Sequence, residues 1–147
     1  MTRNKKDFQL NSLEIASLIQ ASRILNLSTI NKNGLPHLVP MWFITDENGL
    51  INFTSYHKSQ KIVNLIRDKR IVVMVESGNN YEDLKGITIE GVGIIDNNES
   101  LLLKTIDAIT NKYGVNRTIS DNNKMLTKRV NVKIIPKKII SWDLSKS

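Results

Sequence analysis

The sequence predicts a single α+β domain whose antiparallel sheet closes, or nearly closes, on itself. The length of 147 residues suits one domain with one core; we expect residues 1–147 to form it, with residues 1–10 as a tail that need not be ordered. Apolar patterning gives about seven strands and about three or four short helices. Turn signals such as Asn33-Gly34 join consecutive strands into hairpins. This combination is typical of α+β folds and barrels.

A helix and a hairpin come first. Asn11 is placed to cap a helix over residues 12–21, and Glu14 can reach back to complete a capping box. The stretch Arg23–Ile30 alternates apolar and polar side chains, which predicts a strand. Asn33-Gly34 follows, and this pair favours a tight turn in which both residues take positive φ.

The next predicted strand, over residues 35–45, contains two prolines. Pro36 and Pro40 cannot donate ladder hydrogen bonds, so we expect an edge, a bulge or an opening in the sheet there. A turn leads from this strand into another over residues 50–54. Residues 55–57 are expected to form a short loop.

The remaining elements follow from periodicity and turn signals. The prolines and glycines among them mark interruptions, and Gly91 and Gly93 predict a bulge or a close backbone approach. In order, these elements are a helix from Lys58 or Ser59 to about Arg67, a strand over 71–75 buried on both faces, a strand over 86–95, a helix ending near Tyr113-Gly114, a loop over 115–123, and two strands over 129–135 and 138–142, broken by Pro136.

Composition excludes several kinds of site. The chain has no cysteine, which excludes disulfides, thiolate catalysis and cysteine-based metal sites. His37 and His57 are the only histidines, fewer than the ligands of a zinc site, so we expect no metal. No stretch reaches the ~20 apolar residues of a membrane span and no signal peptide is visible, so we expect a cytoplasmic protein without a membrane partner. No nucleophile or acid–base pair stands out, and no catalytic residue is predicted.

The net charge of +7 has two explanations that the sequence leaves open. A basic protein attracts nucleic acid, a membrane surface or a small anion. A solvated, lysine-rich surface accounts for the same charge equally well. No strip of aromatic and basic residues offers the stacking platform that single strands need. We therefore expect only weak, non-specific association with nucleic acid.

The segment from Thr54 to Leu65 is the most informative. A strand ends in the hydroxyl residues Thr54 and Ser55, and the following helix opens with Lys58 and Lys61 on one side of its first turn. Free amides and the helix dipole favour an anion at such a helix start, and nearby hydroxyls add donors. An ordinary capped surface helix explains the same spacing, and spacing alone favours it by roughly two to one.

Several motifs, taken together in their order and spacing, resemble the pyridoxamine-phosphate-oxidase-like superfamily, the flavin and deazaflavin split barrels. The resemblance covers Leu25 to Trp142. It implies a six-stranded split β-barrel that forms a homodimer with two cofactor sites at the subunit interface. The segments that carry it are 25–30, 33–37, 39–43, 53–54, 59–61, 64–71, 89–93 and 134–142.

The resemblance assigns roles to residues of this chain. Lys61, helped by Ser59 and Lys58, would hold the cofactor phosphate. Relatives often carry arginine two residues before this lysine, and Ser59 stands there instead, which makes Lys58 the candidate for the missing charge. The implied contacts to the rest of the cofactor are the backbone of Val39, Pro40, Met41 and Trp42 along the ring, Thr54 and Ser55 at the ribityl chain or ring edge, and Trp142 closing the site from the other subunit.

The implied activity is that of an oxidoreductase moving hydride between a flavin-type cofactor and a small conjugated substrate. F420 is slightly favoured over FMN, because the Trp42-Phe43 strand end and segment 76–86 look more like the deazaflavin-using branch. A basic surface also suits an acidic cofactor tail. The alternative is a non-catalytic module of the same fold that binds or stores flavin or haem, since one fold serves many functions.

Overall fold

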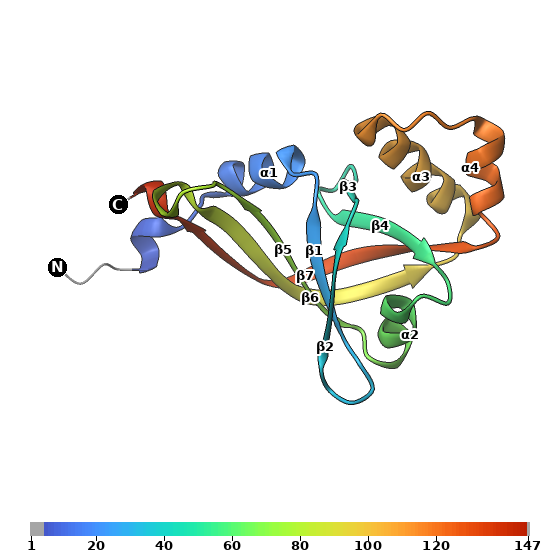
Figure 1. Cartoon of the computed structure of the whole chain (residues 1–147), viewed down its shortest axis with the longest axis horizontal. Coiled ribbons are helices and arrows are strands. Elements are labelled where there is room, and N and C mark those ends of the chain that lie inside the picture. The colour runs from blue at the N-terminus through green and yellow to red at the C-terminus, as the bar shows by residue number, and fades with distance from the viewer. Residues whose placement is uncertain (1–4, 147) are drawn as a thin grey trace.

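The computed structural model describes residues 5–146, and these build one curled antiparallel sheet (Figure 1). The sheet order is β2-β1-β5-β6-β7-β4-β3, with every neighbouring pair antiparallel. The predicted α+β class is confirmed. The strands are β1 (Leu25–Ile30), β2 (Pro36–Met41), β3 (Ile44–Thr45), β4 (Ile51–Tyr56), β5 (Arg70–Ser77), β6 (Lys85–Asp96) and β7 (Arg129–Asp143).

The sheet has seven strands, the number that apolar patterning predicts and one more than the resemblance implies. The long strand predicted over residues 35–45 breaks after Met41. Its first part, β2, forms an edge of the sheet in the single chain, as its prolines predict, and both are exposed there. The opposite change occurs at the other end of the chain. Pro136 does not divide two strands, because it pairs with Gly91 at a bulge and β7 continues through it.

Helices α1, α2 and α3 pack against this sheet, and α4 packs on α3. The Asn11–Glu14 capping box is confirmed at the start of α1, with bonds of 2.9 and 3.0 Å. Helix α4 corrects the loop predicted over residues 115–123; a second capping box, between Thr118 and Asp121, begins it. The helices are α1 (Ser12–Ala21), α2 (Gln60–Arg67), α3 (Glu99–Tyr113) and α4 (Ile119–Met125), with 3₁₀ turns at η1 (Lys5–Phe8), η2 (Tyr81–Asp83) and η3 (Leu144–Lys146).

Two local predictions need correction. Gly34 takes a φ of 86°, but among the described residues only glycines have positive φ, so Asn33 does not. The Asn31 amide donates to the Leu35 carbonyl at 2.9 Å, and the Gly34 amide donates to the Asn31 carbonyl at 2.8 Å. These bonds close a longer loop that needs one left-handed residue and not two. The second correction concerns Ser55 and Tyr56, which continue β4 by pairing with β7 and do not form a loop.

The N-terminal tail was predicted over residues 1–10, of which 1–4 lie outside the described residues. Lys5–Phe8 form a 3₁₀ turn, and Leu10 is buried. The Leu10 amide donates a 2.9 Å hydrogen bond to Ser141 Oγ, which ties this segment to β7. None of the described helices is long and apolar enough to cross a membrane.

The core lies inside the curl of the sheet and is closed at one end by α2. Leu25 and Phe53 are fully buried there, and Ile62 and Leu65 point into it from α2. Helix α3 covers the other face of β4 and β7, so that β4 is buried on both sides. Figure 1 shows α3 and α4 together on one side of this part of the sheet. Thr54, on β4, lies on the α3 side.

The predicted burial of residues 71–75 on both faces is not found within one chain. Inward residues of β5 are buried, whereas Val72 is 39% exposed. Val72 lies level with Ser28, which in turn pairs with Leu38, and Ile140 lies across from Thr88 on the same face. Leu38 and Ile140 are exposed as well. The outer face of the sheet is therefore partly apolar.

Replacing Gly91 with alanine is expected to lower the free energy of unfolding by at least about 1 kcal/mol, as overpacking does. An added Cβ would collide with the carbonyl oxygen of Ile135, which is fixed in the ladder between β6 and β7. Gly93→Ala is the matched control, since its Cβ would meet side-chain atoms and no backbone, namely those of Leu65 at 3.2 Å and Val132 at 3.3 Å. Urea unfolding of both variants tests this; an equal or smaller loss for Gly91→Ala would contradict it.

Candidate anion and cofactor site

A cavity opens between the sheet and the α3–α4 segment. Its volume is about 110 Å³, and it brings three predicted site residues together, namely Met41, Trp42 and Thr54. They come from the end of β2, the break that follows it and the middle of β4. The other lining residues are Ile106 and Ile109 of α3, Arg117 and Met125 of the α3–α4 segment, and Arg129 at the start of β7.

The first turn of α2 offers free hydrogen-bond donors, and it is linked to this cavity through the proximity of Lys61 to Arg129. Ser59 is the N-cap, but its hydroxyl makes no capping bond and lies 2.8 Å from the Ser55 hydroxyl instead. In the described part of the chain, the amides of Gln60 and Lys61 have no acceptor, whereas the next two amides bond to the Ser59 carbonyl. Helix α2 thus presents unpaired amides of the kind that bind anions.

Arg129 is bound to the strand that carries the predicted site. Its Nε donates to Thr54 Oγ1 at 3.0 Å, and its Nη2 donates to the Thr54 carbonyl at 2.8 Å. These bonds hold the guanidinium against β4, and they leave Nη1 without a partner among the described residues. Burial lowers the pKa of Arg129, and the nearby charge of Arg117 lowers it further.

Lys61 belongs to the same cluster. Burial lowers the pKa of the Lys61 ammonium, and the Arg129 charge adds to the effect, so the two cations are electrostatic neighbours. None of the ion pairs found among residues 5–146 involves Lys61, Arg117 or Arg129. Lys61 and Arg129 are thus two partly buried positive charges that repel each other, and a bound anion would remove that cost.

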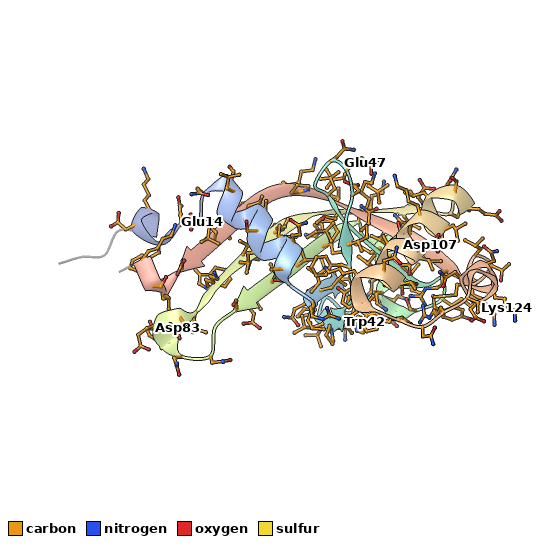
Figure 2. All side chains as sticks on the ribbon, turned by 90° about the horizontal axis from the view of Figure 1, so that it is seen from above. Glu14, Trp42, Glu47, Asp83, Asp107 and Lys124 are labelled. Atoms are coloured by element: carbon orange, nitrogen blue, oxygen red, sulfur yellow. The ribbon has the colours of Figure 1, made fainter. Side chains whose placement is uncertain are left out.

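An aromatic stack forms one edge of the cavity. Trp42 stacks on Tyr113 with ring centroids 4.4 Å apart and planes 12° from parallel. The Tyr113 hydroxyl accepts a 3.1 Å bond from the Phe43 amide and donates to the Arg23 carbonyl at 2.9 Å. Helix α3 therefore fixes the break between β2 and β3. In Figure 2, Trp42 lies with Asp107 and Lys124 in the half of the molecule away from Glu14 and Asp83.

Not every predicted site residue reaches the cavity. Val39 packs against the core, while Pro40 is exposed on the opposite side of β2. Lys58 is exposed and has no bonded partner in the described chain. Trp142 lies near the far end of β7, over Gly86, and lines a different hollow with Phe8. Its predicted contact with the cofactor requires a second subunit.

Arg129 and Arg117 are the site residues that sequence reasoning missed. Arg129 reaches Thr54 across 75 positions, a separation at which no local pattern reports a contact. A basic residue opening the last strand was the only signal, and it looked like part of a surface lysine cluster. Arg117 falls in the segment taken for a loop.

Comparison of this chain with known proteins finds one matching family and several similar solved structures. The family described as pyridoxamine 5'-phosphate oxidase matches residues 13–143. The solved structure of Rv2991, a conserved hypothetical protein from Mycobacterium tuberculosis, is 34% identical, with a TM-score of 0.91 over 99% of this chain and 92% of that one. An F420 reductase is 23% identical, with a TM-score of 0.64 over 84% and 93% of the two chains. HutZ, the haem storage protein of Vibrio cholerae, is 17% identical, with a TM-score of 0.72 over 91% and 97%. The last two show likeness of fold alone, and no curated protein matches.

Proposed function

This chain belongs to the pyridoxamine 5'-phosphate oxidase family, and from that premise we propose that it binds a flavin-type cofactor, F420 or FMN, through the cofactor phosphate and acts as an oxidoreductase on a small conjugated substrate. One observation carries the proposal. Lys61 and Arg129 are partly buried, close to each other and without acidic partners, beside the free amides of α2. An anion at this position satisfies every one of these groups.

Arg129 is our candidate for the positive charge that relatives carry at the position of Ser59. Relatives often carry arginine two residues before the phosphate lysine, and Lys58 was the candidate to replace its charge. Lys58 is exposed, whereas Arg129 lies beside Lys61 and is fixed by two bonds to Thr54. We therefore assign the second phosphate-binding charge to Arg129 and leave Lys58 a peripheral role.

The ring of the cofactor would lie along the end of β2, with Met41, Trp42 and Thr54 at its edge. A bound flavin-type ring supplies hydride transfer, and the protein supplies position, polarity and exclusion of water. The apolar α3 side chains Ile106 and Ile109 keep water from this side of the cavity. Of the residues that the structure describes, no carboxylate or histidine lines it, which suits an enzyme whose cofactor carries the reaction.

F420 is slightly favoured over FMN, because it carries acidic groups beyond its phosphate and the cavity is rich in cations. A structural relative named as an F420 reductase supports the same choice of cofactor class. Haem storage, by analogy with HutZ, is less well supported, because haem needs an axial ligand and neither histidine lines the cavity.

Absorbance and fluorescence titrations of the purified protein with FMN, F420 and haemin test the proposal. Saturable binding of FMN or F420, followed by steady turnover with a reduced cofactor and an electron acceptor, is the expected result. Tight binding without turnover would favour the storage alternative. Binding of haemin alone would contradict the proposal.

The protein is expected to be a dimer in solution. The outer sheet face carries exposed Leu38, Val72 and Ile140, and Trp142 lies too far along β7 to reach the cavity of its own chain. A second subunit would cover the apolar face and bring its own Trp142 to the site. Light scattering on the eluted protein measures this directly, and a monomer with full cofactor affinity would contradict it.

The affinity for FMN is expected to fall as the pH rises through the pKa of Lys61. Burial and the Arg129 charge place that pKa below the ordinary lysine value of 10.5, and only the charged form attracts phosphate. In Lys61→Arg the guanidinium stays charged, so affinity should persist to higher pH. FMN titrations from neutral to alkaline pH, with Lys69→Arg as control, provide the measurement. Parallel pH profiles for Lys61→Arg and the wild type would contradict this role.

A further inference from the structure

The cavity contains more positive charge than one phosphate requires. Lys61 belongs to the first turn of α2 and is an electrostatic neighbour of Arg129, and Arg117 lines the cavity together with Arg129. A phosphate group carries a charge of about −1 to −2 at neutral pH, depending on how many bonds it makes. Lys61 and Arg129 already match that charge, so Arg117 is left without a counter-ion in the cavity.

The acidic residues near Arg117 are engaged elsewhere. Asp107 accepts a 2.7 Å bond from Asn122, which joins α3 to α4. Asp121 completes the Thr118 capping box, and although Arg117 and Lys124 help to lower its pKa, it forms no ion pair with Arg117. Within residues 5–146, the one bond found for the Arg117 side chain is a 3.4 Å contact from Nη1 to Met125 Sδ, a weak acceptor. Most of its donors are therefore free.

The walls between the two arginines are apolar. Ile106, Ile109 and Met125 line the cavity beside Arg117 and Arg129. Two guanidinium groups with free donors, set in apolar walls, are suited to a carboxylate or phosphate attached to a hydrophobic body. Arg117 is exposed as a whole residue, but it lines the same cavity as these three apolar side chains.

We propose that Arg117, together with the free Nη1 of Arg129, binds a second acidic group, separate from the phosphate at α2 and attached to an apolar body packed on α3. This inference rests on the proposed function for the position of the first phosphate. This second acidic group is a carboxylate or a phosphate, and two kinds of ligand could carry it. It is either an acidic extension of the cofactor itself or the acidic group of a separate organic substrate.

Binding measurements on Arg117→Gln distinguish these sources. The matched control is Lys124→Gln, which removes one charge from exposed α4 without touching the cavity. The probes are FMN, which has one phosphate; F420, which has further acidic groups; and 2-naphthoate, with the neutral 2-naphthylmethanol as its comparison. Naphthoate is titrated into both cofactor-free and FMN-loaded protein, and circular dichroism checks that each variant is folded.

If the acid belongs to the cofactor, Arg117→Gln should weaken F420 binding by about tenfold or more while changing FMN binding little. If it belongs to a substrate, naphthoate affinity should fall by a similar factor, and both cofactors should bind as before. The Lys124→Gln protein should match the wild type throughout. Unchanged affinity for F420 and for naphthoate in Arg117→Gln would overturn the inference, as would equal losses in the control.

The naphthoate arm separates this inference from the proposed function. Wild-type protein that binds neither FMN nor F420 refutes the cofactor proposal, yet naphthoate binding to the cofactor-free protein still reports on Arg117. Conversely, Lys61-dependent FMN binding with no effect of Arg117→Gln on any probe refutes the second acidic group alone.

Discussion

Replacing Lys61 with alanine is expected to weaken FMN or F420 binding by about 1–3 kcal/mol, roughly 5- to 150-fold, the usual contribution of a charge-assisted hydrogen bond. The loss should be large because Lys61 is partly buried and has no acidic partner in the described chain, so its charge is directed at the ligand. Fluorescence titration of the variant gives the dissociation constant.

Lys69→Ala is the control for Lys61→Ala. It removes the same charge from an exposed position just after α2 and should leave affinity almost unchanged. Equal affinity of the wild type and Lys61→Ala would mean that the start of α2 is not the phosphate site.

Phe53→Ala is expected to lower the free energy of unfolding by about 3–5 kcal/mol, the range for a large aromatic lost from a packed core. Phe53 is fully buried in β4, where it pairs with Val132 of β7. Neighbouring residues of β4, Thr54 and Ser55, contribute to the candidate site, so the variant should also lose affinity in proportion to its unfolded fraction. Thermal and urea unfolding measure the change.

Val63→Ala in α2 serves as the comparison for Phe53→Ala. Val63 is 44% exposed, and its truncation should change the free energy of unfolding by well under 1 kcal/mol. Losses of similar size in the two variants would show that the core does not lie inside the curl of the sheet.

Local signals in the sequence predicted much of the fold. The Asn11–Glu14 box begins α1 at the expected residue, because both partners lie within one helical turn. Gly114 ends α3 with a φ of 65°, and the two prolines of β2 mark an edge. Each of these features depends on neighbours a few residues away.

Predictions failed where contacts between distant segments decide the structure. Pro136 looked like a strand break, but the bulge at Gly91 accommodates it. The break between β2 and β3 depends on Tyr113, which bonds the Phe43 backbone from α3. Residues 71–75 looked buried on both faces, since a β-branched run does not reveal whether the second face meets this chain's core or another surface.

The candidate site, like the fold, was predicted only where local sequence patterns report on it. The sequence indicated Lys61, Ser59 and the start of α2, because a lysine-rich helix start after a hydroxyl-rich strand is a local pattern. It did not indicate Arg129 or Arg117, which reach the cavity through the pairing of β4 with β7 and the position of α4. In our proposal, the charge that Ser59 lacks is supplied by Arg129 at the start of β7.

The central claim is that the start of α2, with Lys61 and Arg129, binds a phosphate, and comparison of FMN with riboflavin tests it most directly. The two molecules share one ring system and differ by the phosphate alone. The wild type should bind FMN at least tenfold more tightly than riboflavin, and Lys61→Ala should lose most of that preference while binding riboflavin as before. Equal binding of FMN and riboflavin by the wild type, or an undiminished preference in Lys61→Ala, would contradict the account.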